Sequence, residues 1–175
     1  MKPYQVILLI LMLVIFAYIA AFLYVFSHAN DFRVGIKKKS DSLSILLVEK
    51  SLSLTNIDHF FKNSGVVYAE SQDKIMSGIA SIRLDHPDYN ELVNSISLIK
   101  KGEVVIANLS FENQWVLAGN QIGEEKEKLD DLDRNFRAGM ALYNADVNAY
   151  NYWLSIPGYR LAMYILGFRK KKMLS

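Results

Sequence analysis

The chain has 175 residues, with 20 lysines and arginines against 18 aspartates and glutamates, and it has no cysteine. That length allows one domain with a modest core, and without cysteine the chain can form neither disulfides nor thiolate sites. Residues 31–175 hold 19 basic and 18 acidic side chains and are nearly neutral. Nucleic-acid binding needs a basic face with interleaved aromatic residues, and the sequence shows none, so we expect no nucleic-acid partner.

Near the N-terminus, Val6–Phe26 is a run of 21 residues without charge, proline or glycine. As a helix this run would extend roughly 31 Å, which matches a bilayer core of about 30 Å. Tyr4 and Tyr24 would then lie near the two interfaces. The sequence therefore predicts an uncleaved transmembrane helix at about 6–26, within a membrane anchor that comprises residues 1–30.

A cleaved signal peptide is the alternative, because Ser27-His28-Ala29 loosely fits a small-x-small cleavage site. The apolar run is longer than a typical signal peptide core and only Lys2 precedes it, which favours the anchor. Basic residues set the orientation, with Lys2 on one side and Arg33 and Lys37–Lys39 on the other. The excess predicts that the N-terminus lies outside and the C-terminal domain lies in the cytoplasm.

Helical periodicity then dominates residues 31–175. Residues 31–62 carry regularly spaced leucines and isoleucines, which predicts a first helix that could continue the anchor. A turn at Asn63–Gly65 separates it from a second predicted helix, Val66–Leu84. Asp85–Asp88 is a break in which Pro87 is expected to be the first residue of the next helix.

The third predicted helix runs to about Leu117, with apolar positions from Leu92 onward. Lys101-Gly102-Glu103 interrupts this pattern. The segment Glu103–Ile106 could instead be a short strand, but a lone strand has nothing to pair with, so we favour a helix there.

The fourth predicted helix, about Gln121 to Ile156, has the clearest pattern, and Pro157-Gly158 ends it. Its core stripe should include Leu132, Met140, Val147, Leu154 and the residues that recur at sevens, which are Ile122, Leu129, Phe136, Tyr143 and Tyr150. Helices joined by short connections bury their apolar stripes against one another. The predicted fold class is therefore all-α: a transmembrane helix followed by an antiparallel bundle of about four helices in residues 31–175.

Beyond the proline, the segment Tyr159–Phe168 has no charge between Arg160 and Arg169. It should form a helix of two to three turns that Gly167 stops. If it docks on the bundle, Tyr164 and Phe168 are buried. If it lies in the membrane interface, lipid headgroups contact the basic residues, which are Arg169, Lys170, Lys171 and Lys172.

The sequence offers no catalytic, cofactor-binding or metal-binding candidate, and we expect no cofactor. Its three histidines share no helical turn, and the acidic residues at 124–133 alternate with basic ones, as on a solvated helix face. Asn144 and Asn151 lie beside the core stripe. Their amides would either bond neighbouring helices and fix the bundle's register, or bind a partner or ligand.

The last third of the chain resembles the LemA family of bacterial membrane-anchored helical proteins. The residues that carry the resemblance are Tyr143, Asn144, Val147, Tyr150, Asn151, Pro157, Gly167 and Phe168, followed by the basic run at 169–172. The segment from Tyr68 to Arg83 is similar to a second motif of the family, and Ile36–Asp41 to a third. The resemblance implies a cell-membrane location, and some relatives take part in building membrane organelles in magnetic bacteria.

These features together predict a non-catalytic single-pass protein that serves as a scaffold or assembly factor at the membrane, with a role in membrane or organelle biogenesis implied by the resemblance. Its expected partners are membrane lipids, through the anchor, and an unidentified protein, with a homo-oligomer as a further alternative. A different class of function is the alternative: a membrane-bound sensor or enzyme accessory that binds a small ligand within the bundle. A cavity lined by Tyr143, Asn144 and Asn151 would favour that alternative.

Overall fold

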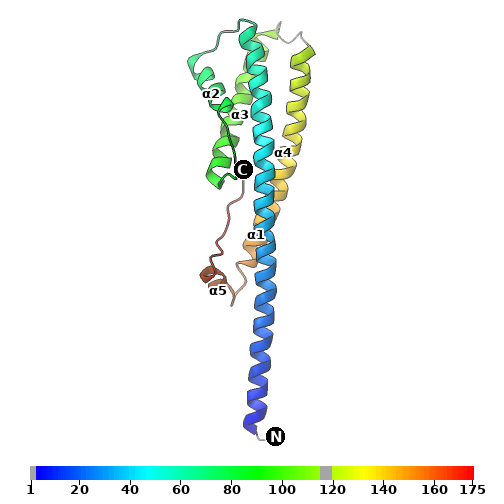
Figure 1. Cartoon of the computed structure of the whole chain (residues 1–175), viewed down its shortest axis with the longest axis vertical. Coiled ribbons are helices and arrows are strands. Elements are labelled where there is room, and N and C mark those ends of the chain that lie inside the picture. Colours follow the sequence, from blue (N-terminus) through cyan, green and yellow to red (C-terminus); the bar gives the residue numbers. More distant parts are fainter. Residues whose placement is uncertain (1–2, 115–119) are drawn as a thin grey trace. The chain divides into compact units, whose positions relative to one another are not determined.

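The computed structural model describes residues 3–114 and 120–175, apart from the side chains of residues 120 and 121. Within them the regular elements are helices, which confirms the all-α prediction (Figure 1). The helices are α1 (Pro3–Asn63), α2 (Glu70–Ala80), α3 (Tyr89–Glu112), α4 (Asn120–Trp153) and α5 (Arg160–Ile165). The chain divides into two compact units. Unit 1 comprises Met1–Lys37 and Asn144–Met173, and unit 2 comprises Lys38–Tyr143 and Leu174–Ser175.

Helix α1 is a single helix of 61 residues that contains both the apolar run and the helix predicted after it. By length and composition it could cross a membrane, and none of its most apolar window is buried within the protein. Burial begins at Val25 and Ala29, which are 4% and 0% exposed. The helix ends at a Schellman motif around Gly65, which has φ +79°. The Gly65 amide donates to the Lys62 carbonyl at 3.0 Å, and the Val66 amide donates to the Phe61 carbonyl at 3.1 Å.

Helix α2 is shorter at both ends than the predicted Val66–Leu84. After the Gly65 turn the chain stays extended until the Ala69 amide donates to the Gln72 side chain at 2.9 Å, which fixes the start of the helix. At the other end the Ser81 hydroxyl donates to the Gly78 carbonyl at 2.7 Å. Side chains that compete for backbone groups at both ends therefore shorten the helix.

Helix α3 begins one residue after Asp88, so the expectation that Pro87 is its first residue is wrong. Asp88 and Glu91 form a capping box with two 2.8 Å hydrogen bonds, and this reciprocal pair places the helix start. Glu103–Ile106 lies inside the helix, as favoured over a strand. The helix ends at Glu112, earlier than predicted, and the predicted end near Leu117 lies outside the described residues.

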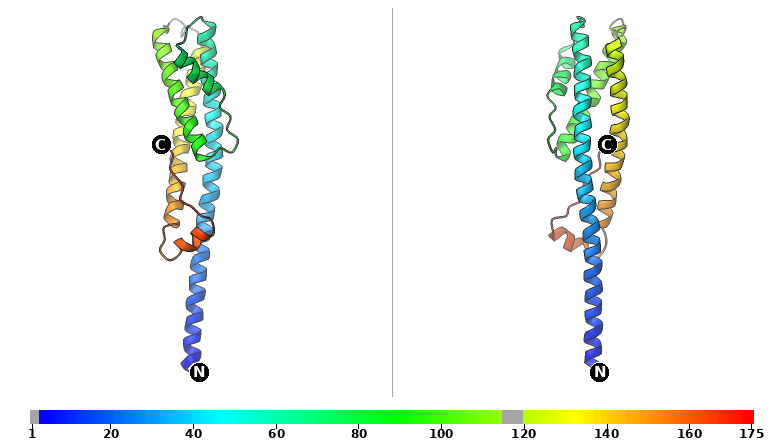
Figure 2. Two further views of the ribbon diagram at one scale, coloured as in Figure 1. Left: turned by 90° about the vertical axis from the view of Figure 1, so that its left-hand side faces the viewer. Right: turned by 45° about the vertical axis from the view of Figure 1, so that its right-hand side comes forward.

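Helix α4 runs from Asn120 to Trp153, close to the predicted bounds. Most of its predicted core stripe is buried: Ile122, Leu132, Phe136, Tyr143, Val147, Tyr150 and Leu154. Leu129 and Met140 are exceptions and are only half-buried. Met140 lines a hollow of about 410 Å³ beside Lys50. Figure 2 shows α2 and α3 beside the section of α1 that belongs to unit 2.

Unit 2 has an aliphatic core with polar links between helices. Its α1 stripe is fully buried at Leu43, Leu47, Leu54, Ile57 and Phe61. Three polar side chains of α1 reach α4: Lys39 donates to the Leu142 carbonyl at 3.3 Å, Lys50 to Asp133 at 3.0 Å, and Ser53 to Glu125 at 2.6 Å. The division of the chain at residues 30 and 31 that the sequence suggested stays a prediction.

Candidate functional site

The residues that carry the family resemblance gather in unit 1, apart from Tyr143, which is the last residue of the α4 section of unit 2. Tyr143 is 5% exposed and Tyr150 is 1% exposed, so both tyrosines of the repeated pair are core residues. Burial raises the pKa of Tyr150 despite the nearby cations of Arg33 and Arg169. The two tyrosines therefore support the fold and remain neutral at ordinary pH.

Asn151 holds the C-terminal tail rather than a neighbouring helix. Its side-chain amide donates to the Lys171 carbonyl at 2.9 Å, and its side-chain oxygen accepts from the Lys171 amide at 2.9 Å. The asparagine therefore pairs with one residue of extended chain as a β-strand neighbour would. The sequence favoured a bond from this amide to a neighbouring helix, and the structure gives it the backbone of the basic tail instead. Asn144 is half-buried and lies on α4, seven residues earlier.

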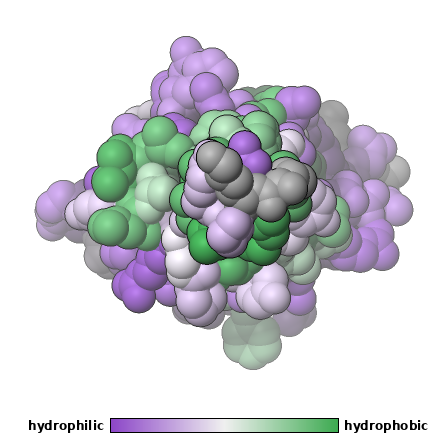
Figure 3. Space-filling model, turned by 90° about the horizontal axis from the view of Figure 1, so that it is seen from below, coloured by the Kyte–Doolittle hydropathy of each residue, from purple (hydrophilic) through white to green (hydrophobic). Residues whose placement is uncertain are grey.

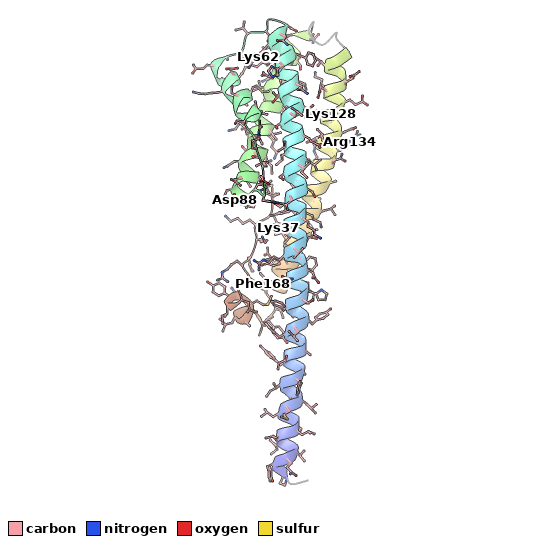
Figure 4. The ribbon with its side chains drawn as sticks, viewed as in Figure 1. Lys37, Lys62, Asp88, Lys128, Arg134 and Phe168 are labelled. Carbon is pink, nitrogen blue, oxygen red and sulfur yellow. The ribbon has the colours of Figure 1, made fainter. Side chains whose placement is uncertain are left out.

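Phe168 is the point at which the tail enters the core of unit 1 (Figure 4). It is 5% exposed, and its ring centroid lies 5.5 Å from that of Phe26 and 6.5 Å from that of Tyr150. The Arg33 guanidinium lies 5.4 Å from the ring centroid, at a cation–π distance. Phe168 thus joins the end of the apolar run to the repeated tyrosine motif.

Gly167 produces this burial. It adopts φ +83° and forms a Schellman motif, in which the Phe168 amide donates to the Met163 carbonyl at 3.0 Å. The motif brings Met163 and Phe168, both buried, to the same side of α5. Tyr164 points away and is 57% exposed, so the docking prediction is confirmed for Phe168 and wrong for Tyr164. Helix α5 is also shorter than predicted, at six residues.

The turn after α4 reaches the apolar run of α1. Gly158 has φ +86°, a conformation that glycine adopts readily, and its carbonyl accepts from the Tyr18 hydroxyl at 2.9 Å. Tyr159 lies 5.2 Å from Tyr18 and 6.0 Å from Phe22, measured between ring centroids. Tyr18 and Phe22 belong to the apolar run that the sequence assigns to the membrane. Figure 1 draws α5 beside this blue section of α1.

His28 and Trp153 form a second contact that sequence reasoning missed. Their rings stack at 4.9 Å with planes 16° apart, and Tyr24 packs edge-on against both. The sequence treated His28 as an isolated residue at the membrane interface. His28 follows Tyr24 and Val25 by four and three residues, so the three side chains share one face of the helix. This shared face, together with Trp153 at the end of α4, was the signal from which the sequence could have predicted the contact.

An apolar surface remains on α5 after this packing. Leu161, Tyr164, Ile165 and Leu166 are between 51% and 74% exposed. Figure 3, viewed from the end where the apolar run begins, shows hydrophobic surface on the end-on helix and in a lobe beside it, on the side where Figure 1 draws α5. Large exposed apolar groups next to one another are typical of interaction or membrane surfaces.

The two units carry opposite charge. Unit 1 has eight basic and two acidic side chains, and unit 2 has twelve basic and sixteen acidic ones. The basic run at 169–172 therefore belongs to a strongly positive unit that also contains the apolar run. The side chains of all four residues are exposed.

Unit 2 contains a buried cation that the sequence did not single out. Lys50 is 3% exposed and lies 2.6 Å from Glu103 of α3 and 3.0 Å from Asp133 of α4. Its position between Leu47 and Leu54 in the apolar stripe of α1 was the signal for this burial. A hollow of about 410 Å³ lies beside these three residues, and Tyr143, Asn144 and Asn151 do not line it.

Three acidic residues of α4 form ion pairs or accept hydrogen bonds from side chains of α1. Asp131 pairs with Arg134, Asp133 with Lys50 and Arg137, and Glu125 accepts from Ser53 and Asn56. Among the described residues, no three acidic or histidine side chains are grouped closely enough to hold a metal ion.

Comparisons with protein-family models, curated proteins and solved structures found no match to this chain. The resemblance to the LemA family thus stays a prediction that depends on the residues described above.

Proposed function

We propose that this chain is a divergent LemA-family protein, a non-catalytic single-pass scaffold or assembly factor of the cell (inner) membrane. The observation that carries this proposal is the contact of the C-terminal segment with the apolar run. An apolar helix that could cross a membrane is also what a signal sequence offers. Here, however, cleavage after Ala29 would cut α1 at a residue that is fully buried in unit 1, which favours an anchor that stays in place.

The contact also bears on depth in the bilayer. A bilayer needs about 20 apolar residues and the run has 21, so nearly all of it, including Tyr18, is needed to cross. Tyr18 precedes Phe26 by eight residues, which is about 12 Å of helix. Because Gly158 and Tyr159 contact Tyr18, the turn would lie within the leaflet, and the exposed apolar side chains of α5 would lie in lipid rather than in water.

Charge supports the same arrangement. The seven basic side chains of unit 1 that follow the apolar run would meet anionic headgroups, each favourable by roughly 1 kcal/mol near the surface. The basic run at 169–172 adds to Arg33 and Lys37 on the C-terminal side of the apolar run. This excess supports a cytoplasmic location for the C-terminal domain and an outside N-terminus by the positive-inside rule.

For unit 2 we propose an antiparallel helical bundle. Residues 39, 50 and 53 of α1 bond to residues 142, 133 and 125 of α4, so one number rises as the other falls. Bonded residue numbers that rise along α1 while they fall along α4 are expected for two antiparallel helices.

A bundle held at the membrane could recruit a protein partner through apolar residues that its own core does not use. Ile45 and Leu52 of α1 are 60% and 55% exposed, and Val104 and Phe111 of α3 are 59% and 79% exposed. Each pair is seven residues apart and so lies on one face of its helix. Such stripes are suited to a helical partner or to a second copy of this chain. Through the resemblance, we propose a role in membrane or organelle biogenesis.

The absence of cysteine makes the anchor directly testable, because each introduced cysteine is unique. The mature protein in native membranes should retain residues 1–30, and a new N-terminus at or after Asn30 would refute the anchor. Ser175→Cys should resist a membrane-impermeant maleimide in intact cells and react once the cells are opened. Labelling of intact cells would reverse the orientation.

The scaffold role needs a separate test. Crosslinking of the full chain in native membranes should yield a defined protein complex, and the double variant Ile45→Asp/Leu52→Asp should lose it with an unchanged melting temperature. A matched control is Lys74→Asp/Lys128→Asp, which alters exposed side chains elsewhere on unit 2. Equal loss of the complex in both variants would argue against a specific partner face.

A further inference from the structure

Unit 1 contains a hollow of about 570 Å³ between the end of α4, the turn after it and α5. Apolar side chains form much of its wall, among them Leu154, Leu161, Met163 and Phe168. Three cations, Arg160, Arg169 and Lys170, also line it. Its volume lies within the range of about 300–1,000 Å³ typical of small-molecule sites.

The charge on this wall is of one sign. Among the described residues that line the hollow, none is acidic. Arg169 is held in place by hydrogen bonds from its Nη1 to the carbonyls of Tyr164 and Phe168, and its guanidinium lies 3.5 Å from the centroid of the Tyr164 ring. Both carbonyl bonds use Nη1, and a guanidinium has five N–H donors in a fixed plane, so the group is well suited to receive a phosphate.

One residue of the wall, Gly158, indicates where the hollow lies relative to the membrane. Gly158 lines it and accepts the hydrogen bond of Tyr18, which belongs to the apolar run. If that run spans the bilayer, as the proposed function holds, the hollow opens among acyl chains and headgroups. A molecule that fits there needs an anionic group for the three cations and a hydrocarbon part for the apolar wall.

We propose that this hollow binds one anionic phospholipid from the surrounding leaflet. The phosphate lies between Arg160, Arg169 and Lys170, and an acyl chain lies along Leu161 and Phe168. This lipid site rests on the proposed membrane function and makes it more specific. The hollow would select a class of lipid, whereas the basic tail alone would attract any anionic surface. Lipid binding would then fasten α5 to the end of α4.

The test uses the full chain, purified in an uncharged detergent, and native mass spectrometry with dioleoyl phosphatidylglycerol or dioleoyl phosphatidylcholine. One molecule of the anionic lipid should stay bound at concentrations where the zwitterionic lipid does not. The double variant Arg160→Gln/Lys170→Gln should weaken retention roughly 30-fold, since each charge near a phosphate contributes about one step of roughly fivefold.

The matched control is Lys171→Gln/Lys172→Gln, which removes the same amount of charge, next to Lys170, at residues that do not line the hollow. It should change retention less than threefold. Equal losses in the two variants would overturn the site and leave only general attraction to the tail. Equal retention of the two lipids would also overturn it.

The acyl half of the proposal has its own pair of variants on α5. Leu161→Asp should abolish retention, whereas Ile165→Asp, at a residue equally exposed but outside the hollow, should not. Inorganic phosphate at the same concentration should not displace the lipid, and displacement would show a phosphate site instead. A negative result in these lipid measurements would leave the anchor proposal intact, because the anchor is tested separately by whether the mature protein retains residues 1–30. Failure of the lipid site and failure of the proposed anchor are therefore distinguishable.

Discussion

Unit 1 and unit 2 are built from sections of the same two helices, yet their interiors differ in chemistry. Among the described residues the close ring pairs lie in unit 1, where Phe26, Tyr150 and Phe168 meet. Unit 2 is packed mainly by leucine and isoleucine, with single buried rings at Phe61, Phe136 and Tyr143, and is linked by the buried Lys50. Aromatic rings with polar tips suit the boundary between lipid and water, whereas an aliphatic core with acidic surface suits water.

The difference shows that one helical period can serve two environments. The seven-residue recurrence in α4 passes from Phe136 through Tyr143 to Tyr150 without a break, and all three are buried. What changes along the helix is the side chain that flanks the stripe, from the ion-paired Asp133 to the tail-binding Asn151. Periodicity therefore predicts burial, and the flanking polar residues indicate what each section contacts.

The largest expected effect is on the core of unit 2. Phe136→Ala should lower the free energy of unfolding by about 3–5 kcal/mol, because it removes a buried ring and leaves a cavity. Urea unfolding of the full chain in mild detergent, followed by circular dichroism, measures the loss. Phe111→Ala is the control, since this ring is 79% exposed and its loss should change stability by less than about 0.5 kcal/mol. Equal effects would mean that unit 2 is not packed as described.

The buried cation is the second test of unit 2. Lys50→Met should cost about 2–3 kcal/mol, because Glu103 then loses its ion pair and Asp133 keeps only Arg137 as a counter-charge. The two carboxylates are 31% and 27% exposed, so the cost should be below that of a fully buried pair. The triple variant Lys50→Met/Glu103→Gln/Asp133→Asn should recover most of the loss. A triple variant no more stable than the single one would show that Lys50 acts by packing alone.

Asp133 should also make unit 2 sensitive to acid. Burial opposes its ionisation, but the hydrogen bond and charge of Lys50, with Arg137, hold its pKa below the ordinary value of 3.8. A lowered pKa in the folded state stabilises the fold above the unfolded pKa, and this contribution is lost as the pH falls through the folded value. Below about pH 4 the wild type should therefore lose up to roughly 1.5 kcal/mol more than Asp133→Asn. Urea midpoints at pH 7 and pH 3 measure the difference, with the exposed Asp131→Asn as the control.

Sequence reasoning was strongest where one helix carries a long, regular pattern. The stripe from Ile122 to Leu154 predicted α4 and its buried face, and the uncharged run predicted the exposed N-terminal section of α1. Helix ends were less predictable, because single side chains decide them. Gln72 starts α2 and Asp88 starts α3, and each does so by a local hydrogen bond that periodicity does not contain.

The candidate site was predictable in its residues but not in its contacts. The sequence singled out Asn151, Gly167 and Phe168, but it could not show that Asn151 pairs with the backbone of Lys171, because backbone partners have no sequence signature. The contact of Tyr18 with Gly158 joins residues 140 positions apart. Such a contact depends on how α4 and its turn lie against α1, which no local pattern specifies.

Gly102 of α3 contrasts with Gly123 of α4, another glycine within a helix. The sequence suggested that Gly102 interrupts a helix, but it lies within α3, where an added Cβ would collide with the buried Ile79 of α2. Gly102→Ala should therefore cost about 1–2 kcal/mol through overpacking. Gly123→Ala has open space on α4 and should gain up to about 1 kcal/mol from helix propensity. Thermal unfolding measures both, and two changes of the same sign would refute the close packing of α2 on α3.

The smallest expected effect concerns unit 1. Asn151→Ala should remove both hydrogen bonds to Lys171, at a cost of about 1 kcal/mol, since each is exposed and contributes little after exchange with water. Its clearer consequence is release of the tail, whose lysines and arginine are trypsin sites. In the full chain in mild detergent, cleavage at residues 169–172 should become several-fold faster, because proteolysis follows the population of the open form. Asn148→Ala, on an exposed position of the same helix, should leave the rate unchanged. If the two variants were cleaved alike, the tail would be held by contacts other than those of Asn151, and the repeated asparagine would have no part in fastening the basic segment to unit 1.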